Sequence, residues 1–332
     1  MRLQINKEVL SSFEPSKIFR NQIDQSQITS LDYDNSGQFL ISAGNNEAID
    51  LYDCVKGKHL KNIVSKKYGC HLARFTHDSE KCLYVTTKVG EEHSIRYLSL
   101  NNNQYIRYFR GHQGLVNSME ISPTDDDVFL TSSWDNSVRV WDLRSSNCQG
   151  FMNCKSPSFV SIDPSGLVFA IGNSSTKEIG LYDIRNYDQE PFLTNVNWNK
   201  LEFSNDGKYI IIGTSNDDSH YVIDSYEGDL VGKLQGFKTI PPRNYPDTGS
   251  VSLLADGRYA IGGSGSREMM IWDLQELGAG GDSGMGSDSE LKAEKVGIPR
   301  MTLFNPKFMM FATADIDVTM WLPDIDDTQN IK

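Results

Sequence analysis

The chain has 332 residues, of which 38% are hydrophobic and 23% charged, and its formal net charge is −12. This composition is typical of a folded globular protein and argues against a disordered chain. No apolar run approaches the roughly 18 residues that a membrane helix needs. The acidic balance argues against sequence-independent nucleic-acid binding, because that binding depends on neutralising phosphates with Lys and Arg.

Signals for export, metal binding and catalysis are missing from the sequence. The first eight residues lack the apolar core of a secretory signal, so we expect the protein in the cytosol or the nucleus. The five cysteines are scattered without a Cys-x-x-Cys pair, and the six histidines do not cluster. We therefore expect no metal, no cofactor and no catalytic activity.

A repeated unit of alternating apolar residues runs through the whole chain. Its clearest copy begins at Gly111-His112 and ends at Trp141-Asp142, which is the Gly-His to Trp-Asp unit of WD repeats, folded as one four-stranded blade. Counting this copy, the repeat ends seven times, about 41–49 residues apart: Tyr52-Asp53, Tyr97-Leu98, Trp141-Asp142, Tyr182-Asp183, Ile223-Asp224, Trp272-Asp273 and Trp321-Leu322. We predict an all-β, seven-bladed WD-repeat β-propeller that spans residues 1–332 as a single domain.

A short N-terminal segment is predicted to close the ring. Residues 17–20 (Lys-Ile-Phe-Arg) stand before the first repeat as residues 107–110 stand before the third. The segment therefore takes the position of an outer strand, where it would complete the last blade and remove an exposed sheet edge.

The third repeat carries the residues of a buried polar network. His112, Ser133, Asp135 and Trp141 fit the structural tetrad of WD repeats, in which Asp holds the buried His while Ser and Trp donate. A His-Ser-Asp trio could also indicate a hydrolase, but the placement of these residues favours the structural role. Asp217 and Asp315 occupy the matching Asp positions of the fifth and seventh repeats.

Two insertions interrupt the repeat. Residues 237–248 form a Pro-rich stretch with Arg243 and Tyr245 on the Gly-His face, where it either contacts a partner or rigidifies a long connection. Residues 278–297 are rich in Gly, Ser and Asp and predict a flexible loop. Its serines Ser283, Ser287 and Ser289 have acidic neighbours, so they are candidate phosphorylation sites.

Several residues are candidates for a partner-binding surface. Trp134 stands directly before Asp135 and either contacts a partner or folds over a neighbouring blade. Basic residues could engage an acidic or phosphorylated peptide, or form a solvated rim. These are Lys66, Lys67, Arg107, Arg110 and Arg144.

Longer strings resemble one particular family. The most specific are residues 65–69 (Ser-Lys-Lys-Tyr-Gly), 94–100, 105–112, 141–150 and 304–309. Together they resemble the small WD-repeat family, in a fungal-type form, shared by COMPASS, a SET-domain histone methyltransferase complex, and the cleavage and polyadenylation factor with its type-1 phosphatase module.

The resemblance implies a non-catalytic nuclear scaffold. Its expected partners are the SET-domain methyltransferase subunit, a regulatory subunit of the polyadenylation factor and phosphatase, and RNA polymerase II with phosphorylated C-terminal repeats, with no membrane and no sequence-specific nucleic acid. The implied roles are histone H-three methylation, transcription termination and mRNA 3′-end processing. Two alternatives stay open: direct reading of the phosphorylated polymerase repeats, and a substrate receptor of a ubiquitin ligase.

Overall fold

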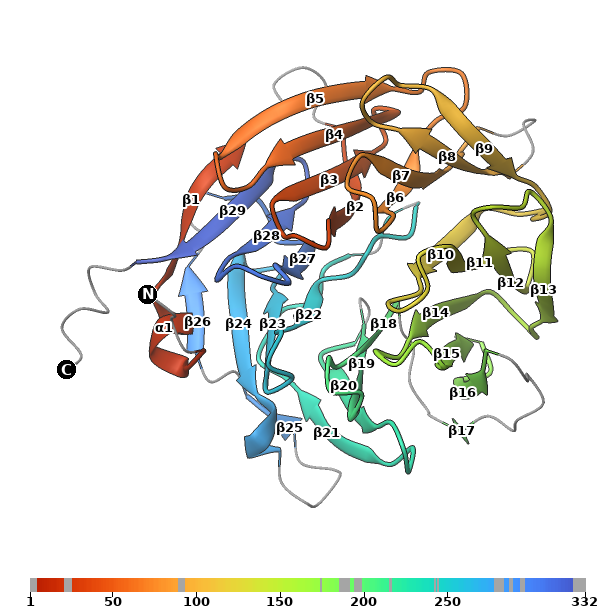
Figure 1. The fold of residues 1–332 in the computed structure, drawn as a ribbon. Coiled ribbons are helices and arrows are strands. Elements are labelled where there is room, and N and C mark those ends of the chain that lie inside the picture. The colour runs from red at the N-terminus through yellow and green to blue at the C-terminus, as the bar shows by residue number, and fades with distance from the viewer. Residues whose placement is uncertain are drawn as a thin grey trace.

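The computed structural model describes residues 5–20, 26–88, 93–173, 175–184, 192–193, 199–214, 217–241, 243, 245–277, 284–286, 289–292 and 296–324. Within these ranges, seven antiparallel sheets stand around a central axis as the blades of a propeller (Figure 1). The predicted fold is therefore confirmed. No helix in the described part of the chain is long and apolar enough to cross a membrane.

In the first six blades, consecutive strands lie side by side, from the inner to the outer edge of the blade. Blade one contains β2 (Ile28–Tyr33), β3 (Phe39–Gly44), β4 (Ala48–Asp53) and β5 (Lys58–Val64). Blade two contains β6 (His71–Phe75), β7 (Lys81–Val85), β8 (Ile95–Ser99) and β9 (Tyr105–Phe109). Blade three contains β10 (Val116–Ile121), β11 (Val128–Ser133), β12 (Ser137–Asp142) and β13 (Cys148–Asn153).

The next three blades continue the ring. Blade four contains β14 (Ser158–Ile162), β15 (Val168–Asn173), β16 (Glu178–Asp183) and β17 (Phe192–Leu193). Blade five contains β18 (Lys200–Phe203), β19 (Tyr209–Gly213), β20 (His220–Asp224) and β21 (Leu230–Leu234). Blade six contains β22 (Val251–Leu253), β23 (Tyr259–Gly263), β24 (Glu268–Asp273) and β26 (Ser289–Lys292), with the 3-10 helix η1 (Leu274–Glu276) after β24.

Blade seven joins the two ends of the chain. It contains β27 (Met301–Phe304), β28 (Phe311–Ala314) and β29 (Val318–Pro323), and its outer strand is β1 (Phe13–Phe19), which follows α1 (Lys7–Ser11). β1 pairs antiparallel with β29, so an N-terminal strand closes the last blade as predicted. The strand is longer than residues 17–20 because Phe13 is buried and packs on Phe311 with ring centroids 5.1 Å apart.

The core lies between the blades rather than at the centre of the ring. Each apolar cluster combines side chains from two adjacent blades; one of them joins Leu83 and Phe109 of blade two to Phe129 and Trp141 of blade three. The turns between first and second strands repeat the same geometry, and Gly207 in one of them has a φ of 71°, which favours glycine. Removing one blade would therefore expose two apolar interfaces.

The segment 278–297 is not one flexible loop. Its residues Ser289–Lys292 form β26, the fourth strand of blade six, where Leu291 is buried in a cluster that includes Leu10. β25 (Gly284–Met285) pairs in parallel with β21 of blade five. The Gly/Ser-rich composition concealed these strands because a single apolar residue anchors the longer one. Ser283 and Ser287 lie outside the described residues.

Candidate partner-binding surfaces

The buried polar network of blade three links four side chains in a chain of hydrogen bonds. Trp141 Nε1 donates to Thr131 Oγ1 at 2.8 Å, and this hydroxyl lies 2.7 Å from His112 Nε2. His112 Nδ1 lies 2.9 Å from Asp135 Oδ2. Burial lowers the pKa of His112. The hydrogen bond from the His112 ring favours the charged form of Asp135 and helps to lower the pKa of that carboxyl group. The neutral imidazole therefore donates to Asp135 and accepts from Thr131.

The prediction that Ser133 supplies the hydroxyl of this network was wrong. Ser133 Oγ donates to the carbonyl of Gly114 at 2.9 Å and accepts from the Asp135 amide. Thr131 and Ser133 share one face of β11, since side chains alternate along a strand. The pairing of Phe129 with Trp141 places the indole within reach of Thr131 and not of Ser133.

The matching Asp positions of two other blades hold different contacts. Asp217 accepts from the Tyr221 hydroxyl at 2.8 Å. Asp315 forms ion pairs with Arg243 and with Arg300. Both carboxylates therefore bind side chains other than a tetrad histidine.

The Pro-rich insertion crosses one end of the ring instead of projecting from it. In Figure 1 the cyan chain between β21 and β22 passes across the ring towards β6. Its first residue, Phe237, stacks on His220 of blade five with centroids 4.2 Å apart. Further along, Tyr245 packs against His71 of blade two at 5.7 Å. The insertion therefore ties opposite sides of the propeller together.

Charged contacts fix this crossing segment. Arg243 pairs with Asp315 of blade seven, and Arg300 donates to the Pro241 carbonyl at 2.6 Å. Burial raises the pKa of Asp247, and the nearby guanidinium of Arg300 opposes that shift. Arg243 and Tyr245, which the sequence offered as partner contacts, are therefore held inside the ring, as expected for a rigidified connection.

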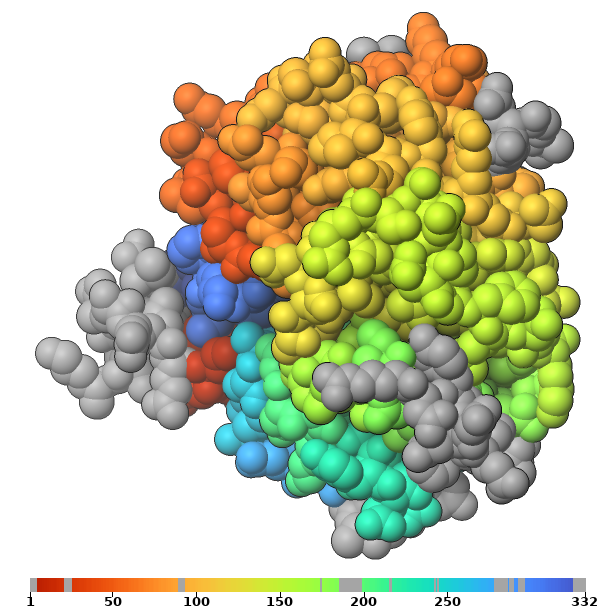
Figure 2. All heavy atoms as spheres, turned by 45° about the vertical axis from the view of Figure 1, so that its right-hand side comes forward, coloured from red at the N-terminus to blue at the C-terminus, as the bar shows by residue number. Residues whose placement is uncertain are grey.

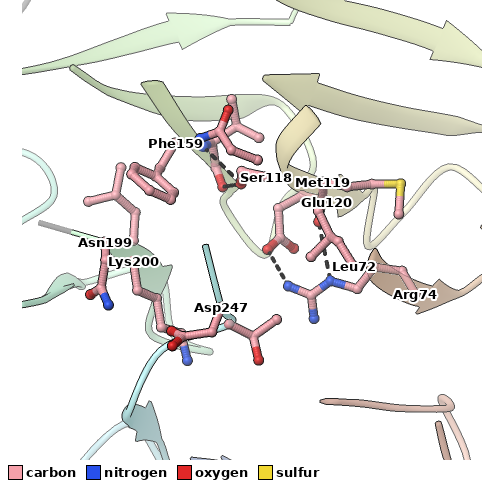
Figure 3. Close-up of a pocket in the computed structure, with 13 residues that line it drawn as sticks. Leu72, Arg74, Ser118, Met119, Glu120, Phe159, Asn199, Lys200 and Asp247 are labelled. Carbon is pink, nitrogen blue, oxygen red and sulfur yellow. Dashed lines mark hydrogen bonds and ion pairs between the residues drawn. The ribbon is translucent and has the colours of Figure 1, made fainter. Parts of the chain in front are cut away.

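The central channel carries compensating charges (Figure 3). Arg74 of β6 donates to Asp32 Oδ1 at 2.9 Å and to Glu120 Oε1 at 3.0 Å. Burial raises the pKa of both carboxyl groups, and Arg74 opposes the shift. Lys200 points into the same space beside Asp247 and pairs with Glu202 at 2.7 Å. Arg74 thus joins blade two to blades one and three, and Lys200 joins blade five to blade six through the Val251 carbonyl at 2.6 Å.

The predicted surface residues do not form one surface. Strands alternate in direction within a blade, so the turn after a second strand and the connection to the next blade lie at the same end. Trp134, in the turn between β11 and β12, lies at this end and is 50% exposed. The connections that carry Lys66, Lys67 and Arg110 lie there too.

Two other predicted residues are engaged elsewhere. Arg144 lies in the turn between β12 and β13, at the opposite end, where it pairs with Asp142 at 2.7 Å and Asp127 at 3.3 Å. Arg107 donates to the carbonyl of Leu143 at 2.7 Å. The five basic candidates therefore do not all lie at one end of the ring, and a role of Lys66, Lys67 and Arg110 in binding an acidic peptide stays a prediction. Within the described ranges, no group of three or more His, Cys, Asp or Glu side chains is arranged to hold a metal ion.

Sequence reasoning missed a cluster at the outer side of blade two, which we name the arginine–tyrosine cluster: Arg96, Tyr68, Tyr105 and Tyr108. The guanidinium carbon of Arg96 lies 3.3 Å from the ring centroid of Tyr68, 4.8 Å from that of Tyr108 and 5.4 Å from that of Tyr105. A bulge in β9 places Tyr105 and Tyr108 on the face of Arg96. The signal in the sequence was the pair Tyr105 and Tyr108, which does not reveal its cross-strand partner Arg96.

The outer strands of neighbouring blades form one wall beside this cluster. Figure 2 shows blades two and three, coloured gold to yellow-green, side by side on the molecular surface. The outer strand β9 itself exposes Tyr105, Ile106 and Tyr108, which are 37%, 45% and 36% exposed. Aromatic and apolar side chains exposed together on one strand are typical of a protein-binding surface.

Comparisons with known proteins place this propeller in a family. Residues 103–142 match the model of the WD domain, G-beta repeat. The chain is 39% identical to "COMPASS component SWD2" of Saccharomyces cerevisiae, over 97% of this chain and 99% of the relative. It is 38% identical to "Set1 complex component swd2" of Schizosaccharomyces pombe, over 83% of this chain and 79% of the relative. It is 36% identical to "WD repeat-containing protein 82" of Drosophila melanogaster, over 98% and 99%. The chain therefore belongs to the WD-repeat family that contains these three proteins.

Proposed function

We propose that this protein is a non-catalytic scaffold subunit of a COMPASS-type SET-domain histone methyltransferase complex in the nucleus. The observation that carries the proposal is the 39% identity to a COMPASS component along nearly the full length of both chains. A match of that extent spans nearly the whole ring and not a single repeat. It therefore favours a shared set of surfaces and not merely a shared fold.

The same subunit is proposed to serve the cleavage and polyadenylation factor with its type-1 phosphatase module, in transcription termination and mRNA 3′-end processing. This part rests on the resemblance of the strings at 65–69 and 141–150. A closed ring suits a shared subunit because its outer wall and two ends offer separate surfaces on one rigid body. Different partners could then bind without reshaping it.

The ring's own polar groups support a scaffold over a catalyst. His112 and Asp135, the residues that could suggest a hydrolase, are committed to Trp141 and Thr131 in the buried network. The hydroxyl that sequence placed in this trio, Ser133, binds a backbone carbonyl instead. A nucleophile would need a free hydroxyl beside the imidazole.

Affinity purification tests both halves of the proposal. The tagged chain is isolated from nuclear extract, the eluate is separated by size, and each fraction is analysed by mass spectrometry. We expect a SET-domain methyltransferase in one fraction and polyadenylation-factor subunits with the phosphatase in another. A stable cullin-type ligase in place of both would contradict the proposal.

A further inference from the structure

Arg96 is a buried cation with no counter-ion in the described part of the chain. The residue is 5% exposed, its Nε is buried without a hydrogen-bond partner, and no ion pair joins it to any described carboxylate. Arg300, which is similarly buried at 8% exposed, pairs with Asp315 and Asp247. A buried guanidinium normally has such partners, because removing it from water without them is costly.

The tyrosine rings explain how the guanidinium of Arg96 can be buried and from which side an acceptor can approach it. The ring of Tyr68 lies 3.3 Å from the guanidinium carbon, within the range of a cation–π contact. Tyr105 is held in place because its hydroxyl lies 2.9 Å from that of Tyr84. Rings cover a guanidinium on its faces and leave its N–H groups, which lie in the plane, for an acceptor. A carboxylate matches that edge because it can accept two parallel hydrogen bonds.

The surroundings of the cluster favour an acidic ligand with apolar neighbours. Residues 58–70 and 105–110 contain six Lys or Arg and no Asp or Glu, although the chain carries a net charge of −12. Lys67 and Arg110 approach the outer tyrosines, with distances of 4.8 Å to the ring centroid of Tyr68 and 5.9 Å to that of Tyr108. Ile106, at the bulge of β9, is 45% exposed. These two stretches are thus basic, although the chain as a whole is acidic.

The outer edge of a blade can also accept a further strand. Blade five shows this, since β25 adds to β21 in parallel. β9 is the outermost strand of blade two in the described structure. An extended peptide placed along that edge would present alternate side chains to the cluster.

We propose that the outer side of blade two binds an acidic, extended segment of a partner protein, with one Asp or Glu carboxylate on the guanidinium of Arg96. Exposed Ile106 would contact an apolar residue of the same segment. This inference deepens the proposed scaffold function, on which it rests for its biological setting, by assigning the chemistry of one partner.

Fluorescence anisotropy on the purified full chain tests the site. The probe is a fluorescein-labelled peptide of about twelve residues in which Glu alternates with Leu and Ser. Matched probes carry Gln, or phosphoserine, in place of every Glu. We expect the Glu probe to bind, the Gln probe not to bind, and the phosphoserine probe to bind no more tightly than the Glu probe. Arg96→Met should weaken it about ten- to a hundredfold, which corresponds to the loss of one charge-assisted hydrogen-bonded contact.

Control variants keep the test decisive. Arg107→Met changes a residue on the other face of β9 and should leave affinity within about twofold. If Arg96→Met does not fold, the exposed Ile106 serves instead. Both Ile106→Glu and Ile106→Lys remove its apolar contact, but Ile106→Glu should weaken binding more because it also repels the acidic probe. Equal binding of the Gln probe, preference for the phosphoserine probe, absence of binding, or an unchanged affinity of these variants would each overturn the site. Recovery of the same complexes from nuclear extract with a non-binding variant would leave the scaffold function standing.

Discussion

Replacing Thr131 by Val removes one buried hydroxyl while nearly preserving the shape of the side chain. Trp141 Nε1 and His112 Nε2 would then both lose their partner, and both residues are buried. Each unsatisfied buried group costs about 1–3 kcal/mol, so we expect a loss of about 2–5 kcal/mol in the free energy of unfolding. For a chain of this size the melting temperature should fall by roughly 3–7 °C. Thr131 thus tests the revised assignment of the network.

Differential scanning calorimetry, with urea unfolding as a second measurement, provides the comparison. Ser133→Ala is the matched control, because Ser133 also has a buried hydroxyl but binds only backbone groups. We expect it to cost about 1 kcal/mol, the net contribution of one ordinary hydrogen bond. If Ser133→Ala destabilised the protein as much as Thr131→Val, or more, the assignment of Thr131 to the network would be refuted.

Three further predictions concern closure, pH and the crossing segment. Phe13→Ala should lower the free energy of unfolding by about 3–5 kcal/mol in urea, because buried Phe13 anchors the closing strand. Lys17→Ala, at an exposed position of the same strand, should lower it by less than about 0.5 kcal/mol. Equal effects of the two substitutions would contradict closure by β1. Burial lowers the pKa of His71 from 6.5 to about 4. The contribution of the neutral imidazole to the free energy of unfolding is therefore complete above about pH 6.5, and it is lost as the pH falls towards 4. His71→Phe should therefore reduce the loss of stability between pH 7 and pH 5 by about 2 kcal/mol in parallel urea titrations, and an unchanged loss would show that His71 is not the responsible group. Arg243→Met should lower the free energy of unfolding by about 1–3 kcal/mol. The loss is smaller than for a fully unpaired buried charge, because Arg300 still pairs with Asp315. A variant as stable as the wild type in thermal unfolding would argue against a structural role of the Arg243–Asp315 pair.

The ring could be predicted because its signals are local. Each repeat ends in a short aromatic-Asp or related pair, and turns with Asp and Gly mark the first hairpins, so the number of blades follows from counting. The closing strand was found in the same way, by its likeness to residues 107–110. Its true length depends on the contact of Phe13 with Phe311, which lies almost 300 residues further along the chain.

The surfaces could not be predicted because they depend on which strands meet. Thr131 and Ser133 share the same face, and only the pairing of β11 with β12 selects between them. The crossing segment binds Asp315 and packs on His71, neither of which its own sequence indicates. Arg96 meets Tyr108 only through the pairing of β8 with β9. Local patterns therefore predicted the blades but not the groups gathered between them.

The central claim, a scaffold shared by two complexes, is tested most directly by rapid depletion of this protein from its own cells. Methylation of the fourth-position lysine of histone H-three and read-through of transcription past polyadenylation sites would be measured in the same samples, over the first hours after depletion. We predict that methylation falls and read-through rises together, and that the wild-type chain restores both. If either quantity stayed unchanged while the protein was gone, a scaffold shared by the two complexes would be contradicted.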